Sequence, residues 1–440
     1  MKTGEAIKIQ AAFQLTKDDG IKVNSSYNVL LALKTDWNIN GSLKYNEFTE
    51  DCEITKQLKM GDTTFEPGEL PSNFESVLTI YLEQELGVSF TGVAIKNGLE
   101  AFFTQKKYNP VKDFMEKCEE NWDGKERINT LFQQYLGAED TELIQKIALL
   151  FFVAAVKKVY EPDFKFDYVL DLVGGQGIGK TSILQKIGGI WYTDSITDFQ
   201  NKDNFDLMIR SLIVNDDEMV ASKKMGFAEL KSFISKTHLR FRKAYARRAQ
   251  EYAKKFVIAR TTNEVAYLRD KTGERRFLPV MVGMQKQESH PMNMSDDVVK
   301  QIWGEAMVLY HGGYPTVFSK DEEAELEKYR EQFMYVDEIE SLLDEYLDMP
   351  VPQDWDKMGS TQQYSYTQAY INNTSIKSTG KKTKQNKIAT RDILSNVFSS
   401  DATRGKLSKK INYLMTNKKG WETGAFRTNK KLVRGFIRKE

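Results

Sequence analysis

The sequence predicts an α/β protein whose central part is a parallel sheet with helices between its strands. Three unbroken apolar runs, "YVLDLV" (168–173), "SLIVND" (211–216) and "KFVIAR" (255–260), alternate with helical patterns in this part of the chain. Strands that are buried on both faces of a parallel sheet show such continuous apolar runs. We therefore predict an α/β domain over residues 161–320.

The residues before this domain are expected to form two smaller parts. Residues 1–70 hold β-like runs, such as "YNVLLAL" (27–33), and a hairpin connection from Asn38 to Gly41, which predict a small α/β segment. In residues 71–160, the stretches "FESVLTIYLEQEL" and "TELIQKIALLFFVAAVKKV" repeat apolar residues at helical spacing. This pattern predicts a mostly helical N-terminal domain.

The residues after the α/β domain are expected to form a helical extension, a linker and a small module. The extension covers residues 321–350, and the linker covers 351–387 because Ser360 to Lys387 is polar with few branched apolar side chains. Residues 388–440 show two helical patterns followed by a β-ribbon-like end, which predicts a small basic winged-helix-like module.

Charge is distributed very unevenly along the chain. Residues 371–440 carry 18 Lys and Arg against 4 Asp and Glu, whereas the remainder carries 45 against 58. A strongly basic C-terminal part favours contact with a polyanion, above all nucleic acid, although a solvated or disordered tail has the same composition.

Cysteine and histidine content limits the classes of protein that remain open. Two cysteines and three histidines cannot build a zinc framework or a disulfide lattice, and this usage favours a reducing, cytoplasmic location. The longest apolar run, "IALLFFVAAV" (147–156), is well short of the roughly 20 residues of a membrane span. We expect a core helix there and no membrane association.

The stretch "DLVGGQGIGKTSI" (171–183) carries the clearest chemistry. It fits the pattern G-x-x-x-x-G-K-[ST] between a predicted strand and a helix over 181–187, which is the context that this phosphate-binding motif requires. Backbone N–H groups of such a loop converge on phosphate oxygens at the positive end of the helix. The residues expected to bind ATP are Gly174, Gly175, Gln176, Gly177, Ile178, Gly179, Lys180, Thr181 and Ser182.

An acidic strand end supplies the second part of the expected site. In "SLIVNDDEMV", the strand ends at Asp216, Asp217 and Glu218. Carboxylates at this place can hold Mg²⁺ and polarise an attacking water, so we assign Thr181, Asp216 and Asp217 to the metal and Asp217 and Glu218 to catalysis. Acidic clusters at strand ends are also common as solvated turns.

Two further motifs complete the catalytic set. "KFVIARTTN" ends in Asn263, which can orient the lytic water from the tip of a neighbouring strand. "DKTGERRFLPV" carries Arg275 and Arg276 after a turn glycine, and either can serve as a finger that reaches a γ-phosphate in a neighbouring subunit. A purely structural role is the alternative for both arginines.

Basic residues lie among aromatic ones between the second and third motifs. This mixture suits the backbone and bases of single-stranded nucleic acid. The residues expected to bind nucleic acid here and in the tail are Lys231, Lys243, Arg247, Arg248, Lys409, Lys410 and Arg434.

Taken in order, "GGQGIGKT", the acidic strand end, "LKSFIS…LRFRKAYARR", "ARTTN" and "TGERRFLPV" resemble the virulence-associated protein E family. The resemblance is strong over residues 107–280. It implies an AAA+-like P-loop ATPase core related to the superfamily III helicases of phages and mobile elements. It further implies a basic hairpin that touches DNA, the TGERRF arginines at a subunit boundary, a hexameric ring, and primase or replisome proteins as partners.

The chain also departs from this family. The family often has Glu where this chain has Asn215, so the roles of Asp216, Asp217 and Glu218 stay open. The primase region that some larger relatives place in front is missing, and no primer synthesis is expected.

Three functions fit these motifs. The first is an ATP-driven DNA helicase or translocase that acts in replication of a phage or mobile element. The second is an ATP-regulated, origin-binding replication initiator or regulator with little unwinding activity. A packaging motor is third, and the lack of a nuclease-like carboxylate set in the sequence disfavours it.

Overall fold

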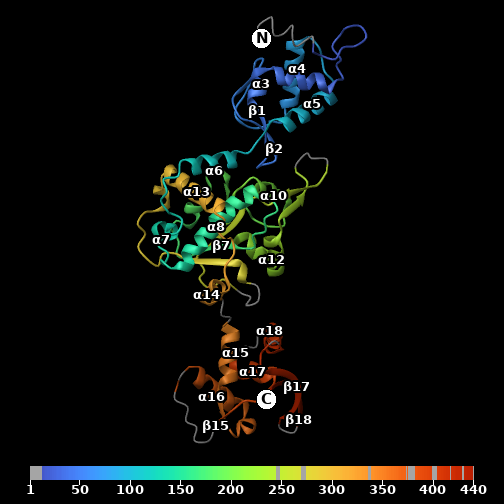
Figure 1. Ribbon diagram of the computed structural model, residues 1–440. Coiled ribbons are helices and arrows are strands. Elements are labelled where there is room, and N and C mark those ends of the chain that lie inside the picture. The colour runs from blue at the N-terminus through green and yellow to red at the C-terminus, as the bar shows by residue number, and fades with distance from the viewer. Residues whose placement is uncertain are drawn as a thin grey trace. The chain divides into compact units, whose positions relative to one another are not determined.

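The computed structural model describes residues 12–243, 248–268, 274–334, 338–372, 374, 382–398, 404–416, 418–428 and 431–439 (Figure 1). The chain divides into two compact units, Met1–Phe333 and Met334–Glu440. Within the first unit, one hydrophobic core gathers residues from Phe13 to Phe103, and another lies around the central sheet.

The N-terminal core is formed by helices that pack on two small sheets. The helices are α2 (Ser26–Thr35), α3 (Trp37–Ser42), α4 (Phe74–Leu86) and α5 (Gly92–Gln105). One sheet has the order β5-β2-β1-β6, from β1 (Leu43–Asn46), β2 (Asp51–Ile54), β5 (Gly68–Glu69) and β6 (Lys107–Tyr108). The other pairs β3 (Leu58–Met60) with β4 (Thr63–Phe65).

Two predictions for the first 70 residues are wrong. The run 27–33 lies in helix α2, where the Ser25 hydroxyl caps the helix and Val29 and Leu33 are buried one turn apart. Residues 38–41 lie in helix α3 and form no hairpin, because the Asp36 carboxylate accepts hydrogen bonds from the backbone of Asn38 and Ile39. In both cases a helix cap outweighs the strand propensity of the residues that follow.

The predicted boundary near residue 70 also differs from the structure. Helices α4 and α5 share the hydrophobic core of the first 70 residues, and β6 adds to their sheet. The cores divide after residue 108, since Val111 on helix α6 (Pro110–Glu120) is the next buried hydrophobic residue and belongs to the central core. The stretch 71–160 is therefore helical, as predicted, but it serves two cores.

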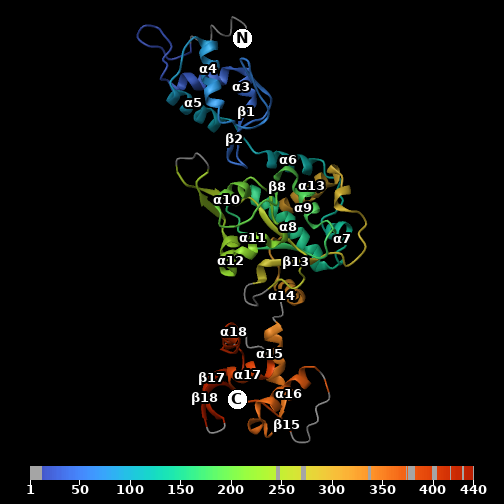
Figure 2. The same ribbon diagram turned by 180° about the vertical axis from the view of Figure 1, so that it is seen from behind.

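The central domain holds a five-stranded sheet with the order β13-β7-β12-β9-β8 (Figures 1 and 2). Every neighbouring pair in it is parallel. Its strands are β7 (Val169–Val173), β8 (Tyr192–Thr193), β9 (Ile213–Asp216), β12 (Val257–Thr262) and β13 (Phe277–Met281). The predicted α/β class and the three predicted strands are confirmed, with ends shifted by one or two residues. Since all five strands run the same way, the segments that follow them meet along one edge.

Helices and one hairpin surround this sheet. The helices are α6 (Pro110–Glu120), α7 (Leu131–Leu136), α8 (Glu142–Tyr160), α9 (Lys180–Gly188), α10 (Lys202–Ile209), α11 (Val220–Lys224), α12 (Phe227–Ser235), α13 (Asp296–His311) and α14 (Lys320–Arg330). The hairpin consists of β10 (His238–Phe241) and β11 (Gln250–Ala253).

Helix α8 contains the longest apolar run of the sequence and is a core helix, as predicted. Its residues from Ile147 to Val156 are buried, apart from the half-buried Leu149, and the ring of Phe152 contacts Trp303 of helix α13 edge-on. Nowhere in the part of the chain that the structure describes does a helix have both the length and the apolar character for crossing a bilayer.

The second unit has its own hydrophobic core. Its helices are α15 (Glu338–Asp348), α16 (Ser360–Ile371), α17 (Thr390–Val397) and α18 (Arg404–Thr416). Strands β14 (Pro350–Pro352) and β15 (Lys382–Lys384) pair with each other. The strands β16 (Lys387–Ile388), β17 (Trp421–Thr428) and β18 (Lys431–Arg438) form a sheet with the order β16-β18-β17.

The predicted linker over residues 351–387 is wrong for its first half. Residues 360–371 form helix α16, in which the buried Tyr366 packs its ring on Trp355. Polar composition concealed this helix because few of its side chains face the core. Residues 373 and 375–381 lie outside the described part. The two helices and the β-ribbon predicted after residue 388 are present as α17, α18 and the β17–β18 hairpin, while their winged-helix identity stays a prediction.

Candidate nucleotide-binding site

The glycine-rich loop joins the end of strand β7 to the start of helix α9, as its sequence predicts. At two positions of the loop, neighbouring atoms leave no room for a Cβ atom, so only glycine fits. A Cβ on Gly174 would lie 2.6 Å from the carbonyl oxygen of Val282, and a Cβ on Gly179 would lie 2.8 Å from Cδ of Pro291. Gly179 also has a φ of 101° and precedes the first helical residue, Lys180. The free N–H groups of the helix start therefore border the loop, where they can bind an anion.

Lys180 turns its ammonium group back onto the loop. The Nζ atom donates to the carbonyl oxygens of Gly174 and Gly175, both at 2.8 Å, and to Oδ1 of Asn263 at 2.7 Å. Burial lowers the pKa of Lys180 from its usual value, and the nearby carboxylates of Glu218 and Asp217 act in the opposite direction. The charge is held in place by neutral carbonyl groups, which phosphate oxygens can replace.

Asp217 is the carboxylate that faces the loop. Its Oδ1 accepts hydrogen bonds from the hydroxyls of Thr181 and Thr261, both at 2.7 Å. A threonine hydroxyl beside a carboxylate offers the hard oxygen ligands that Mg²⁺ prefers. Thr181 and Asp217 therefore fit a magnesium site, and the structure brings these two predicted metal ligands together.

The backbone turns sharply directly after Asp217. Glu218 and Met219 both have left-handed backbone angles, with φ of 51° and 55°. Such a conformation costs a non-glycine residue about 1–2 kcal/mol. It is supported by a hydrogen bond from the Glu218 N–H to the Thr261 hydroxyl at 3.1 Å. The turn directs the Glu218 carboxylate toward Asn263, whose Nδ2 donates to its Oε1 at 3.0 Å.

Asp216 and Asn215 have surroundings of a different kind. The Asp216 carboxylate accepts from the backbone N–H groups of Ala221 and Ser222 and from the Ser222 hydroxyl, so it holds the start of helix α11. Burial raises the pKa of Asp216, which these hydrogen bonds partly offset. Asp216 was predicted as a metal ligand, but the structure places it in this structural role. Asn215 is buried, and its Nδ2 donates to the Tyr192 hydroxyl at 3.1 Å.

A segment that the sequence analysis missed lies beside the phosphate loop. We call residues 283–294 the strap, because they connect strand β13 to helix α13 across the loop. Nε2 of Gln287 donates to the carbonyl oxygens of Tyr135 and Ile178, which ties the strap to helix α7 and to the loop. His290 lines the phosphate pocket with Gly177, Gly179 and Ser182. No motif marks these residues, since they reach the loop only through the path of the chain after β13.

Arg275 and Arg276 lie at the opposite edge of the sheet. They directly precede β13, whose first residue, Phe277, pairs with Val169 at the start of β7. The phosphate loop follows the other end of β7, so the length of the strand, about 13 Å at the usual rise per residue, separates the arginines from it. Arg276 donates to the Ser235 hydroxyl, and both arginines line a cavity of about 360 Å³ that includes Glu323.

The residues predicted to bind nucleic acid are spread over both units. Arg248 is exposed beside the hairpin, and Arg247 lies outside the described residues. Lys231 on helix α12 has its ammonium 4.2 Å from the ring centre of Phe227. In the second unit, Lys409 and Lys410 lie on helix α18, and Arg434 is exposed on strand β18.

Lys243 is not placed as predicted. Its ammonium donates to the backbone oxygens of Thr49 and Glu50 and to the Asp51 carboxylate, and only 12% of its side chain is exposed. Lys243, which closely follows the end of β10 at the connecting side of the β10–β11 hairpin, therefore links the hairpin to the turn between β1 and β2. A polyanion would have to displace these acceptors to reach it.

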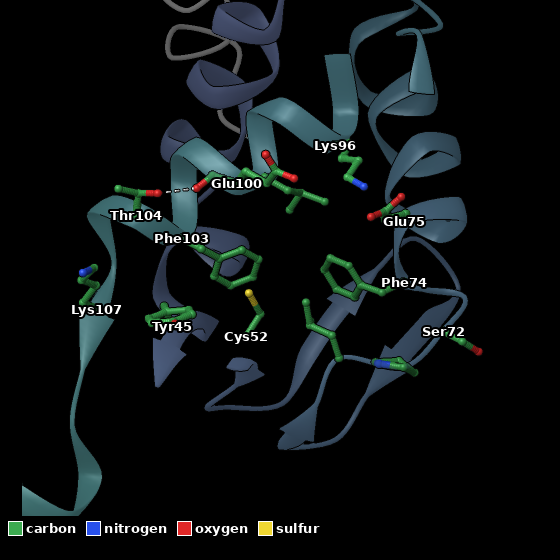
Figure 3. A pocket seen from close by; sticks show the side chains of 13 residues that line it. Tyr45, Cys52, Ser72, Phe74, Glu75, Lys96, Glu100, Phe103, Thr104 and Lys107 are labelled. Carbon is green, nitrogen blue, oxygen red and sulfur yellow. Dashed lines mark hydrogen bonds between the residues drawn. The ribbon is translucent and has the colours of Figure 1, made fainter. Parts of the chain in front are cut away.

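A further cavity, of about 910 Å³, lies in the N-terminal part. Figure 3 shows the rings of Tyr45, Phe74 and Phe103 and the Cys52 sulfur around it, and Lys96, Glu75 and Glu100 line it as well. The phosphate pocket is smaller, at about 290 Å³, but it holds the loop, Lys180, Thr181, Glu218 and Asn263. Of these two cavities, the smaller one combines a helix start with a cation, which is the arrangement that suits an anion such as a phosphate group.

Comparison with known proteins yields one family and several solved structures. A family model described as the virulence-associated protein E-like domain matches residues 115–335. No curated protein sequence matches the chain. The A form apo structure of the NrS-1 C-terminal region (305–718) is 15% identical, covers 94% of this chain and 100% of that chain, and has a TM-score of 0.47. Another apo structure of that region is 14% identical, covers 90% of this chain and 95% of that chain, and has a TM-score of 0.44.

Proposed function

The chain belongs to the virulence-associated protein E-like family, and we propose that it is a Mg²⁺-dependent ATPase that moves along DNA in the replication of a phage or mobile element. One observation carries the proposal. Lys180, Asn263 and Glu218 form a continuous hydrogen-bonded chain across the phosphate pocket, with Thr181 and Asp217 beside it. This arrangement provides a cation, a metal site, and an amide next to a carboxylate.

The chemistry follows from these positions. Lys180 exchanges its bonds to the loop carbonyls for the β- and γ-phosphates of ATP and neutralises the charge that develops on them. Bound Mg²⁺, held by Thr181 and Asp217, would withdraw further charge from the phosphates. Asn263 orients a water, and Glu218 accepts its proton as the water oxygen bonds to the γ-phosphorus and the bond to the β-phosphate oxygen breaks.

Two features support DNA as the partner. Arg240, Arg242 and Arg248 are exposed on and beside the β10–β11 hairpin, which belongs to the same domain as the ATP site. The C-terminal part carries a large excess of basic residues. The motif resemblance to superfamily III helicases supports the same partner. Nucleotide-linked movement of the hairpin would carry a bound strand along.

The arginines support a ring of subunits. Because Arg275 and Arg276 lie at the far edge of the sheet, they cannot reach the nucleotide of their own subunit. Both arginines line a cavity of their own subunit. We propose that the phosphate pocket of a neighbouring subunit docks against this cavity. In this proposal, each ATP is completed by an arginine from the next subunit.

Measurement of ATP hydrolysis with and without single-stranded DNA, followed by unwinding of a forked duplex, tests this proposal. Lys180→Ala is expected to lower turnover by on the order of 100-fold or more. Lys186→Ala is the matched control, since Lys186 lies on the same helix and pairs with Asp296 at the surface. Turnover of the Lys180 variant within about threefold of the parent would contradict the assignment of the loop. DNA-stimulated hydrolysis without strand separation would instead favour the ATP-regulated initiator.

A further inference from the structure

The strap holds His290 in a fixed position over the phosphate loop. Its backbone is tied to helix α7 and the residue after it by bonds from Gly283 N–H to Leu136 O and from Met284 N–H to Gly137 O, both 2.8 Å long. Gln287 adds the side-chain link to the loop itself. On the far side of His290, Pro291 is buried against Gly179. The ring is therefore positioned by anchors on both sides of it.

The hydrogen bonding of the ring determines which nitrogen of His290 carries the proton. Nδ1 of His290 accepts a hydrogen bond from the Met292 N–H at 3.3 Å. In a neutral imidazole, the nitrogen that accepts carries no proton, so the proton lies on Nε2. Nε2 lies 3.2 Å from the position that a Cβ on Gly179 would take, and the ring lines the pocket. His290 thus places an N–H donor beside the loop, and its aromatic ring is part of the wall of the pocket.

The order of the strands in the sheet indicates which end of a bound nucleotide lies next to His290. Asp217 and Glu218 follow β9, and Asn263 follows β12, so the groups for the metal and the γ-phosphate lie on one side of β7. The strap follows β13, which lies on the other side of β7. A nucleotide whose γ-phosphate is near Asn263 therefore extends its nucleoside toward the strap.

We infer that His290 binds the nucleoside end of the nucleotide, through its Nε2–H and its ring face, and so contributes to the affinity for ATP apart from the phosphate contacts. This inference rests on the proposed ATP site. A nucleoside has hydroxyl and ring-nitrogen acceptors for the N–H and a base that can stack on the imidazole. The phosphates already have the loop, Lys180 and Thr181.

The substitution His290→Asn separates this contact from the fold of the strap. Asparagine is a good helix-capping residue, so its short side chain can still accept from the Met292 N–H. It lacks the ring and cannot place a donor where Nε2 lies. The matched control is His311→Asn, at a histidine that pairs with Glu119 at the surface of helix α13. Unchanged thermal unfolding of both variants verifies that the strap is intact.

Calorimetric titration with ATP, ADP and inorganic tripolyphosphate provides the test. His290→Asn is expected to weaken the binding of ATP and of ADP by about tenfold each. It should also raise the KM for ATP with little change in kcat. Binding of tripolyphosphate should be the same as in the parent. Unaltered ATP affinity, or an equal loss for tripolyphosphate, would overturn the inference.

The same titrations distinguish this failure from failure of the proposed function. If the parent binds ATP and Lys180→Ala weakens that binding, the proposed ATP site is supported. The result for His290→Asn then tests the role of His290 alone. If the parent does not bind ATP, or if Lys180→Ala binds ATP as tightly as the parent does, both the proposed ATP site and the inference about His290 are contradicted.

Discussion

At the scale of single residues, Thr261 determines how the acidic turn is arranged. Its hydroxyl donates to the Asp217 carboxylate and accepts from the Glu218 N–H, so one oxygen holds both the proposed metal ligand and the strained backbone beside it. Thr261 is buried in strand β12, and in the proposed site it does not contact ATP directly. It is therefore a positioning residue for the proposed reaction.

Removal of this hydroxyl should impair hydrolysis more than binding. Thr261→Val keeps the shape of the side chain, yet it frees Asp217 and Glu218 to leave the turn, and we expect turnover to fall about tenfold to 100-fold. Nucleotide affinity should change by less than about threefold. Thr262→Val is the control for loss of a buried threonine hydroxyl from the same strand, since the Thr262 hydroxyl accepts from the Glu264 N–H and bonds to neither Asp217 nor Glu218. Rescue of turnover by Thr261→Ser would identify the hydroxyl as the cause, and normal turnover of the valine variant would show that the turn needs no such support.

At the scale of elements, helix α8 carries a lysine within the hydrophobic core. Lys158 is 1% exposed, and its ammonium donates to the carbonyl oxygen of Phe164. Burial lowers the pKa of Lys158 to about 8, and the charge of Asp167 opposes the shift only in part. Below pH 8 the lysine is charged in the folded and the unfolded chain, so the full cost of burying the charge lowers stability.

This cost should diminish as the pH rises. Between pH 8 and about 10.4, the folded chain loses the proton while the unfolded chain keeps it, so the contribution of Lys158 to stability improves. We expect Lys158→Met to unfold at a temperature about 5 °C above that of the parent at pH 7, and this difference should shrink by pH 9.5. Lys157→Met is the control, because Lys157 pairs with Glu161 at the surface. A difference that stays constant with pH would contradict the lowered pKa.

At the scale of the whole molecule, the proposed function gives separate tasks to the two edges of the central sheet. The edge after the strands carries the phosphate loop, the acidic turn and Asn263. The edge before the strands carries Arg275 and Arg276. If both sets of residues act on one ATP, a single chain holds both halves of the site but cannot bring them together, which is why we propose assembly into a ring.

Mixing of two inactive variants tests this arrangement. Arg276→Ala keeps an intact phosphate loop, and Lys180→Ala keeps an intact arginine, so some interfaces between unlike chains combine the intact halves. At equal amounts with random assembly, about a quarter of the sites should be complete, and hydrolysis should recover accordingly. The same mixture with Arg275→Ala shows which arginine acts. Absence of recovery at every ratio, with assembly verified by sedimentation, would place the arginines within their own subunit or in a structural role.

Much of the central domain could be predicted from the sequence because its signals are local. A glycine pattern between an apolar run and a helical repeat is determined by adjacent residues, so the loop and three strands lie where the sequence predicted them. The N-terminal segment was harder to predict. There, Ser25 and Asp36 cap helices whose residues also have strand propensity, and packing between α2 and α5 decides between the two structures.

By itself, the sequence determined the α/β class, the phosphate loop, and the carboxylate and amide residues from which the candidate site is built. Only the tertiary structure decided which of them face one another. It directs Asp217 toward Thr181 and uses Asp216 for helix α11, it engages Lys243 with a distant turn, and it brings His290 to the loop. The physical reason is that these contacts join residues far apart in the chain, and their geometry depends on strand order and on buried hydrogen bonds that no local pattern records.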